Sequence, residues 1–318
     1  MTSLGYALST EEHGPTTGAQ HVVEAEAAGF DFVMVSDHYH PWVDAQGHSP
    51  FVWGLLGAIA TLTDRIPVGT GVTAPINRLH PAIVAQAAAT TAIQMDGRFT
   101  LGLGTGENLN EHVLGHRWPP HHVRLDMLEE AIQVINLLWE GGMQNFHGDY
   151  YTIENARVYE LPEERIPMAI AASGERTAAL AGHYGDAMVS TAPDADVVDR
   201  FETAGGEDKP RYGQVHVCYA ESESAAVDTA YTQWPNGAIT GELGQLLPTP
   251  AHFEQATAMV EPADIAETIV CGPEADAHRE AIDAFVEAGF DHVYVHQIGP
   301  GQSAFFDFYK RDILPAYD

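Results

Sequence analysis

A polar segment follows an apolar run near the start of the chain. The run Phe32–Val35 predicts a buried strand, and Asp37, His38, His40 and Trp42 come soon after it. An imidazole can exchange a proton near neutral pH, and a neighbouring carboxylate can fix its tautomer. These residue types at one strand end indicate acid–base chemistry. The competing interpretation is that Asp37 caps a helix and that His38 is only a satisfied polar residue.

A second polar segment follows the apolar run Phe99–Leu103 and reads GTGENLNE over residues 104–111. Glu107 can be an acid–base group across a barrel mouth from His38, or a carboxylate that a helix start favours through the helix dipole. Asn110 can hydrogen-bond a heterocycle that carries an amide, or it can close a turn. Two such segments in one half of the chain point to an enzyme.

Small residues end two other predicted strands. Residues 69–75 read GTGVTAP, and residues 171–174 read AASG. Glycine permits unusual backbone angles and the close approach of a ligand. A small segment with polar backbone before a helix suits a phosphate or a ring edge. All four segments lie at predicted carboxyl ends of strands, where parallel α/β proteins bind their ligands.

Short strands alternate with helices along the chain, and AGFD recurs at two of the joints, residues 28–31 and 288–291. Glycine favours the positive φ found just beyond a helix. Apolar residues spaced three and four apart predict a helix over His121–Trp139. The first strand–helix turn lacks a glycine-rich dinucleotide fingerprint, so the α/β pattern predicts a (β/α)8 TIM barrel over a doubly wound sheet. The predicted strands are Leu4–Leu8, Phe32–Val35, Ile66–Gly69, Phe99–Leu103, Met168–Ala171, Ala187–Val189, Gln214–Tyr219 and Val293–Val295.

Two segments do not fit the repeat. Residues 141–164 have the composition of a hairpin, and residues 232–262, rich in Gly and Pro, that of a long loop with a short helix. Long insertions at an active face are typically lids or specificity loops. We therefore expect one TIM-barrel domain over residues 1–318, with both insertions at its C-terminal face.

The chain is strongly acidic. Among its 318 residues, 14 Lys and Arg oppose 45 Asp and Glu, which gives a formal net charge of −31. Nucleic acids and anionic membranes need positive charge to displace counterions, so neither is an expected partner. With 45% hydrophobic residues the chain can still fill a large core, and the acidic surface indicates adaptation to high salt.

Targeting signals and a disulfide framework are not visible. Cys218 and Cys271 are too few for such a framework. The first residues lack the basic and apolar regions of a secretory signal, and no apolar run reaches the ~20 residues of a membrane span. We expect a soluble, cytoplasmic protein.

Taken together, the segments resemble the bacterial-luciferase-like superfamily, and within it the oxidoreductases that use the deazaflavin coenzyme F-420. The combination of Asp-His-x-x-Pro-Trp, which begins at Asp37, with GTGENLNE is similar to the glucose-6-phosphate and secondary-alcohol dehydrogenases of that branch. The resemblance covers most of the chain. It implies a homodimer that transfers a hydride between a carbinol carbon and C5 of the deazaflavin.

The resemblance also implies roles for single residues. His38 would accept or stabilise the proton of the substrate hydroxyl, with Trp42 beside the reacting centre and Glu11 assisting. Glu107 would be an acid–base group near the cofactor N1; which of His38 and Glu107 handles which proton is left open. A cis peptide at Gly71–Val72 would back the ring. The other residues implied to bind the cofactor are Asp37, Ala74, Thr105, Gly106, Asn110, Ser173, Gly174 and Thr177.

One departure concerns the substrate. The sugar-phosphate enzymes of the branch place a Lys shortly after a strand-six Thr, to bind phosphate. Thr191 is present here as a substrate residue, but Asp194 follows where that Lys would stand. A carboxylate would repel a phosphate monoester. We expect a secondary alcohol or an unphosphorylated sugar.

Three alternatives stay open at this point. An FMN-dependent monooxygenase of the same superfamily would stabilise a flavin peroxide in a dry pocket. A zinc amidohydrolase is suggested by His38-x-His40 among 17 histidines, but the first predicted strand, Leu4–Leu8, lacks the His-x-His that such a site needs. We therefore expect no metal ion. A cofactor-binding protein without catalysis would not need His38 and Glu107.

The charge generates a prediction about salt. At about 1 M salt the Debye length is roughly 3 Å, so the self-repulsion of the acidic surface is screened. We expect the melting temperature to rise between dilute buffer and molar KCl, as followed by circular dichroism. An unchanged melting temperature would contradict adaptation to high salt.

Overall fold

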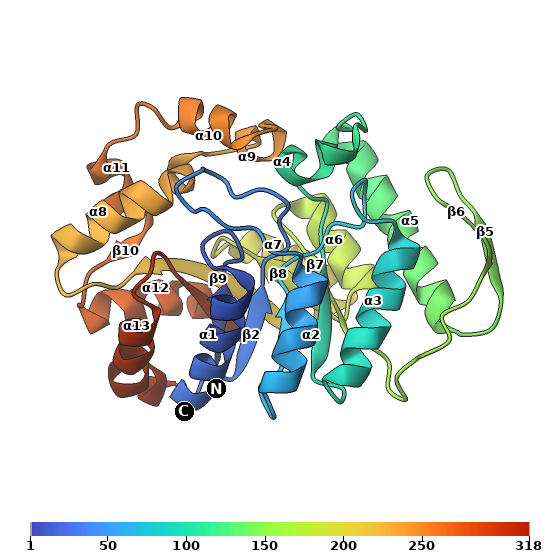
Figure 1. Ribbon diagram of the computed structural model, residues 1–318, viewed down its shortest axis with the longest axis horizontal. Coiled ribbons are helices and arrows are strands. Elements are labelled where there is room, and N and C mark those ends of the chain that lie inside the picture. Colours follow the sequence, from blue (N-terminus) through green and yellow to red (C-terminus); the bar gives the residue numbers. More distant parts are fainter. Residues whose placement is uncertain (1, 318) are drawn as a thin grey trace.

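The computed structural model describes residues 2–317, and its frame is a closed barrel of parallel strands (Figure 1). Each strand pairs in parallel with its neighbours, and the pairing of β8 with β9 closes the ring. The predicted (β/α)8 TIM barrel is confirmed. In order around the ring, the strands are β1 (Ser3–Leu8), β2 (Phe32–Val35), β3 (Val68–Thr70), β4 (Phe99–Leu103), β7 (Met168–Ala171), β8 (Ala187–Ser190), β9 (Arg211–Cys218) and β11 (His292–Gln297).

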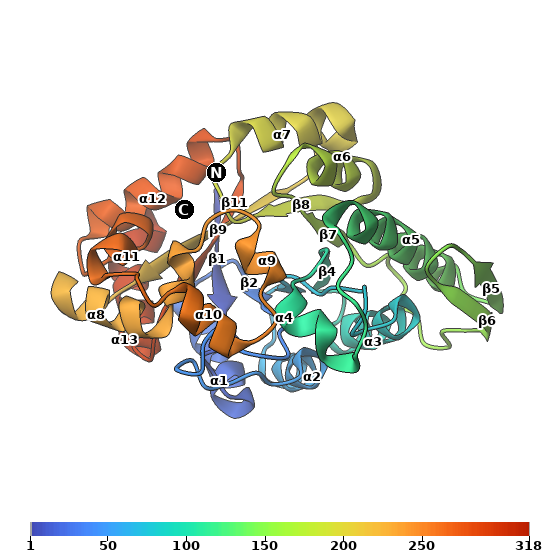
Figure 2. The same ribbon diagram turned by 90° about the horizontal axis from the view of Figure 1, so that it is seen from above.

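Helices surround the barrel (Figures 1 and 2). Gly29 and Gly289, from the two AGFD joints, have φ of 104° and 100°, the left-handed region that glycine tolerates. The predicted helix His121–Trp139 has these bounds in the structure. The helices of the ring are α1 (Pro15–Ala28), α2 (Val52–Leu62), α3 (Pro81–Gln94), α5 (His121–Trp139), α6 (Glu175–Tyr184), α7 (Ala195–Phe201), α8 (Glu223–Gln233), α12 (Ala275–Glu287) and α13 (Gln302–Phe308).

Side chains alternate between the two faces of the strands. In β2, Val33 and Val35 pack in the core between barrel and helices, whereas Phe32 and Met34 point into the barrel. Inside the barrel they meet Ala7, Ala169 and other small or apolar side chains. This apolar filling ends below the carboxyl ends of the strands and forms the base on which a site can lie.

Residues 232–262 cover the carboxyl ends of the strands, as expected of an insertion at that face (Figure 2). The amide of Asn108, in α4, donates to Leu246 O at 2.9 Å and holds the covering segment in place. The short elements here and beside it are α4 (Asn108–Glu111), η1 (His112–Leu114), η3 (Pro235–Ala238), α9 (Leu243–Leu246), α10 (Pro250–Ala256), α11 (Pro262–Thr268) and β10 (Val270–Cys271), and elsewhere η2 (Glu202–Gly206), η4 (Tyr309–Ile313) and η5 (Leu314–Ala316).

The insertion at residues 141–164 does form a hairpin, but it is not a lid. Its strands β5 (Gln144–His147) and β6 (Thr152–Ala156) connect α5 to β7 and run outside the barrel beside α5 (Figures 1 and 2). The hydroxyl of Tyr151 donates to Pro75 O at 2.8 Å, and the Glu130 carboxylate accepts three backbone N–H groups of the hairpin turn. The expectation that both insertions lie at the active face is wrong for this one.

Two strands also begin more than one residue away from the predicted start. β3 begins at Val68, after Pro67, which has no N–H to offer a neighbouring strand. β9 begins at Arg211, whose side chain pairs with Asp291 at 2.8 Å, so a polar start extends the strand. Within residues 2–317 no helix is both long enough and apolar enough to cross a membrane.

Candidate active site

A cavity of ≈ 600 Å³ opens at the carboxyl ends of the barrel strands. Ala7, Met34 and Tyr294 from the barrel interior line its floor, and Trp234 and Ile239 from the covering segment close it from above. Most of the residues singled out from the sequence lie in its wall. These are Glu11, His38, Trp42, Gly71, Val72, Thr105, Gly106, Glu107, Ser173, Thr177 and Thr191.

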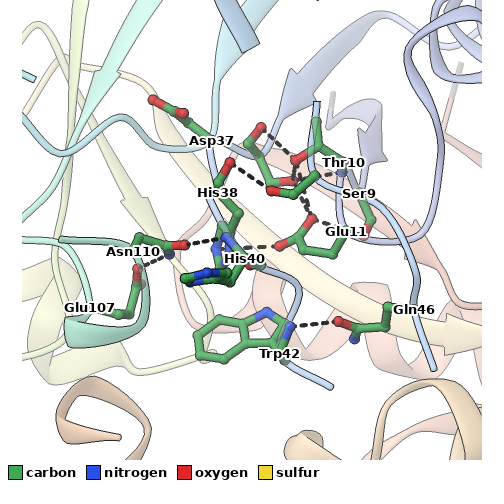
Figure 3. Close-up of polar contacts among 12 residues, drawn as sticks. Ser9, Thr10, Glu11, Asp37, His38, His40, Trp42, Gln46, Glu107 and Asn110 are labelled. Carbon is green, nitrogen blue, oxygen red and sulfur yellow. Dashed lines mark hydrogen bonds and ion pairs between the residues drawn. The ribbon is translucent and has the colours of Figure 1, made fainter. Parts of the chain in front are cut away.

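His38 and Glu11 form a buried pair (Figure 3). Nε2 of His38 lies 3.3 Å from Glu11 Oε1, and the hydroxyls of Ser9 and Ser36 donate to Glu11 Oε2 at 3.0 and 2.6 Å. Burial would raise the pKa of Glu11, but the His38 imidazole and the Ser36 hydroxyl outweigh burial and hold this pKa below its usual value. Glu11 is therefore an ionised carboxylate that can stabilise positive charge on His38.

The second ring nitrogen of His38 also faces an acceptor. Nδ1 lies 3.2 Å from the backbone oxygen of His40. The indole of Trp42 packs on the imidazole, with ring centroids 4.9 Å apart, and Phe253 of α10 packs on the indole. Each ring nitrogen of His38 faces a protein oxygen, so a ring that carries both protons can donate to Glu11 and to His40 O.

Glu107 reaches the same cavity from the β4 side and is coupled to the loop that carries His38. The amide of Asn110 donates to Glu107 Oε2 at 3.2 Å (Figure 3). The oxygen of the same amide accepts the N–H groups of Tyr39 and His40 at 2.8 and 3.2 Å. Asn110 thereby fixes the two acid–base residues relative to each other.

Glycines and a cis peptide form part of the cavity wall between these side chains. The peptide Gly71–Val72 is cis, as the resemblance implies. Gly104 packs against it so closely that a Cβ there would lie 2.7 Å from Val72 Cγ2. A side chain at position 104 would press on Val72, so glycine allows this close approach beside Thr105 and Gly106.

Four residues implied to contact the cofactor lie outside the cavity wall: Asp37, Ala74, Asn110 and Gly174. The Asp37 carboxylate points away from the His38 site in Figure 3, and it accepts from Thr73 Oγ1 at 2.8 Å. Ala74 lies behind Gly106, Asn110 bridges two loops, and the N–H of Gly174 donates to Thr177 Oγ1. Direct cofactor contact by these four stays a prediction; the side-chain polar groups of Asp37 and Asn110 are already used within the protein.

Asp37 belongs to a buried charge network that the sequence analysis missed. Arg78 donates to Asp37 Oδ1 at 2.8 Å and lies 3.5 Å from Glu111 Oε1. Burial would lower the pKa of Arg78, but the two carboxylates outweigh burial and raise it. Burial raises the pKa of Glu111 despite Arg78. Of these residues only Glu111 stood in a sequence motif, as the last residue of GTGENLNE. The residues around Arg78 form no motif that would indicate its role.

Two further histidines in the cavity wall were also missed. His216 lies in β9 and His296 in β11, and the carboxylate of Glu12 contacts His296 at 2.6 Å. Glu11 and Glu12 are adjacent in the chain, yet each serves a different histidine. Only the residue type could have indicated a functional role for His216 and His296. The segments that contain them have the pattern of ordinary buried strands.

The pair His38 and His40 does not converge on one point. Nδ1 of His40 lies 2.9 Å from Leu109 O, and its ring stacks on His112. Across residues 2–317, no group of three or more His, Cys, Asp or Glu side chains is arranged to hold a metal ion. The geometry gives no support to a zinc amidohydrolase centre.

The charge network yields a stability prediction. Replacing Arg78 by Met leaves two buried carboxylates without a cation and should cost ~3–5 kcal/mol of the free energy of unfolding in urea. Adding Asp37→Asn should recover part of the loss, because it removes one uncompensated charge.

Arg65→Met is the matched control. Arg65 is exposed and pairs with Glu26 at 3.9 Å, so its loss should stay within ~0.5 kcal/mol. Equal losses for the two arginine variants would show that the network does not stabilise the loops.

Comparison with known proteins agrees with this geometry. The family model described as luciferase-like monooxygenase matches residues 2–292. The F-420-dependent glucose-6-phosphate dehydrogenase of Microbacterium testaceum is 34% identical, over 98% of this chain and 96% of its own length. The enzyme of the same name from Beutenbergia cavernae is 35% identical, over 99% and 97%.

Among solved structures, an F-420-dependent secondary alcohol dehydrogenase in complex with an F-420–acetone adduct aligns with a TM-score of 0.92 and 29% identity. The alignment covers 100% of this chain and 99% of that one. The family resemblance inferred from the sequence is thus confirmed along nearly the whole chain. This chain belongs to the luciferase-like monooxygenase family.

Proposed function

We propose that this protein is an oxidoreductase that exchanges a hydride between the carbinol carbon of an alcohol and coenzyme F-420. The observation that carries the proposal is the buried His38–Glu11 pair, which shares one cavity with Glu107. Oxidation of an alcohol removes a hydride from carbon and a proton from oxygen, so the site needs a proton acceptor beside the reacting carbon. The similarity to F-420-dependent dehydrogenases supports the same activity.

The cavity fits a planar, phosphorylated cofactor. The cis peptide Gly71–Val72 and the segment Thr105–Gly106 would hold the ring, because Gly104 adds no side chain to that wall. Ser173 would hold the phosphate at the N-terminus of α6, where the helix dipole favours an anion. Thr177 would shape this end of the cavity, since its hydroxyl already bonds the backbone of Ser173 and Gly174. When bound, the deazaflavin would supply a two-electron hydride acceptor at C5.

His38 would take the proton that the alcohol loses, and the product is the corresponding carbonyl compound. The resulting imidazolium has donors on both nitrogens, which face Glu11 Oε1 and His40 O. Because Glu11 stays ionised, it stabilises this charge inside a buried site, where the attraction is stronger than in water.

Glu107 would hold the second exchangeable proton, on the cofactor side. Asn110 fixes its Oε2, and no donor among residues 2–317 reaches its Oε1. One carboxyl oxygen is therefore positioned and the other is available to the bound ring. The two acid–base groups thus serve different partners.

The lining points to an uncharged substrate. Of the described residues that line the cavity, none is Lys or Arg, and Glu11 and Glu107 are acidic. Thr191 lies in the wall, but Asp194 lies outside it, where its carboxylate caps α7 by accepting from Asp196 N at 3.0 Å. A phosphate monoester would find no cation here. A secondary alcohol or an unphosphorylated sugar fits better.

Three expectations from the sequence remain predictions. They are the homodimer, the adaptation to high salt and the cytoplasmic location. The acidic surface, with its net charge of −31, supports the second of them.

The proposed function predicts separable effects on turnover and on binding. His38→Asn and Glu107→Gln should each lower kcat by about 10²–10⁴, the usual contribution of a positioned acid–base group. The dissociation constant of F-420 should change by less than about tenfold in both, because ring and phosphate contacts remain. Turnover is followed in molar KCl as loss of F-420 absorbance with a panel of secondary alcohols and sugars.

Tyr39→Phe is the matched control. Tyr39 lies in the same loop, but its side chain is 54% exposed and only its backbone N–H contacts Asn110, so its kcat should match that of the unmodified protein. Full activity in the His38 or the Glu107 variant would remove that residue from the mechanism.

A further inference from the structure

The wall formed by β9 and β11 carries a hydrogen-bonded chain that the proposed proton transfers do not use. Glu12 Oε2 lies 2.6 Å from His296 Nε2, and His296 Nδ1 lies 2.9 Å from His216 Nδ1. The other oxygen of Glu12 accepts the N–H of Gly299 at 2.8 Å. Glu12 and His296 are buried, and His216 is the member at the cavity end.

When both rings are neutral, only one hydrogen-bond direction satisfies every contact of this chain. A carboxylate at Glu12 only accepts, and its other oxygen already accepts from Gly299 N–H, so His296 would donate from Nε2 and accept at Nδ1. His216 then donates from Nδ1, and its Nε2 becomes an acceptor. Nε2 has no partner among residues 2–317. Burial, with the neighbouring His296, lowers the pKa of His216 to about 3, which keeps this ring neutral.

The surroundings of His216 indicate a bound molecule with hydrogen-bond donors. Trp234, from the covering segment, lies over both rings, with centroids 4.4 Å from His296 and 5.7 Å from His216. Asn236, two residues further, also lines the cavity, although its side-chain oxygen is itself buried and meets no donor among residues 2–317. The acceptor Nε2 of His216 beside an aromatic ring suits a hydroxyl group and the carbon face of a polyol.

We propose that His216 is a specificity-determining residue whose Nε2 accepts a hydrogen bond from a second hydroxyl group of the substrate. Glu12 and His296 are positioning residues that set the direction of this hydrogen bond. The inference rests on the proposed alcohol oxidation and narrows its substrate class. The substrate carries at least one hydroxyl beyond the carbinol that reacts at His38.

The first test compares His216→Phe with the unmodified protein on alcohols that differ in one group. The probes are propan-2-ol, propane-1,2-diol, butane-1,3-diol and 1-fluoropropan-2-ol, all with F-420. For whichever diol the unmodified protein oxidises with the higher kcat/KM, His216→Phe should lower kcat/KM at least about tenfold. This is the effect expected from the loss of one hydrogen bond to a buried partner. For propan-2-ol kcat/KM should stay within about threefold, which serves as the internal control.

Fluorine accepts a hydrogen bond weakly and cannot donate one, so it probes direction. The loss on 1-fluoropropan-2-ol caused by His216→Phe should match the small loss on propan-2-ol. Comparing each substrate across the two proteins cancels the effect of fluorine on the intrinsic reactivity of the alcohol. Equal losses on all four alcohols, or a loss for the fluoro compound as large as for the diol, would overturn the proposal.

Glu12→Gln tests the positioning role and serves if His216→Phe does not fold. The N–H of Gly299 should hold the new amide oxygen, so the amide NH₂ faces His296 and donates. Both rings then reverse, and Nε2 of His216 becomes a donor. Relative to propan-2-ol, kcat/KM for 1-fluoropropan-2-ol should rise at least about threefold. An unchanged ratio would exclude control of polarity by Glu12.

Histidine-selective ¹⁵N NMR of the unmodified protein reads the tautomers without turnover. We expect His296 protonated at Nε2 and His216 at Nδ1; protonation of His216 at Nε2 would overturn the proposal. If the proposed function is wrong, the result differs: no alcohol, with one hydroxyl group or several, would reduce F-420. The inferred substrate class would then also be wrong. Reduction by propan-2-ol with no gain from a diol would overturn this inference alone.

Discussion

Two adjacent carboxylates, Glu11 and Glu12, are buried in the loop that follows β1, and the active face is arranged around them. A buried carboxylate is costly unless donors surround it. Glu11 finds its donors at the end of β2, in Ser36 and His38, and Glu12 finds them at the end of β11, in His296 and the N–H of Gly299. β1 pairs with both of these strands, so one loop can serve both neighbours. The two histidines owe their positions to this constraint.

The remaining contacts hold the loops of the active face in fixed positions relative to one another. Arg78 joins the loops after β2, β3 and β4 through Asp37 and Glu111, and Asn110 joins Glu107 to the backbone beside His38. The covering segment is tied down as well, since the buried guanidinium of Arg124 donates to Gln245 Oε1 at 2.6 Å. A site held from several strands and covered from above can keep its acid–base groups in place and exclude water from a hydride transfer.

Much of the fold could be predicted because its signals are local. Apolar runs gave three strands with correct bounds, Phe32–Val35, Phe99–Leu103 and Met168–Ala171, and two more to within one residue, and periodicity gave the bounds of α5. The position of the hairpin at residues 141–164 could not be predicted, because composition does not say on which face of a barrel an insertion packs. Its place depends on contacts such as Tyr151 with Pro75, 76 residues apart in the chain.

The site was predictable to the extent that its residues fall in recognisable motifs. Those motifs led to His38, Trp42 and Glu107, but the direction in which a side chain points at a strand end is set by partners elsewhere. Asp37 turns away because Arg78 and Thr73 bind it. His216 and His296 are 80 residues apart and meet only when β9 pairs with β11. Sequence patterns that act over a few residues carry no information on such pairs.

The central claim is that this cavity holds a deazaflavin for alcohol oxidation. The most direct measurement is a fluorescence titration of the purified protein in molar KCl, with oxidised F-420 and separately with FMN. The account predicts that F-420 binds at least about tenfold more tightly than FMN, a difference of ~1.4 kcal/mol in binding free energy. Tighter binding of FMN would contradict the account and would place the protein among the flavin-dependent monooxygenases, with different roles for His38 and Glu107.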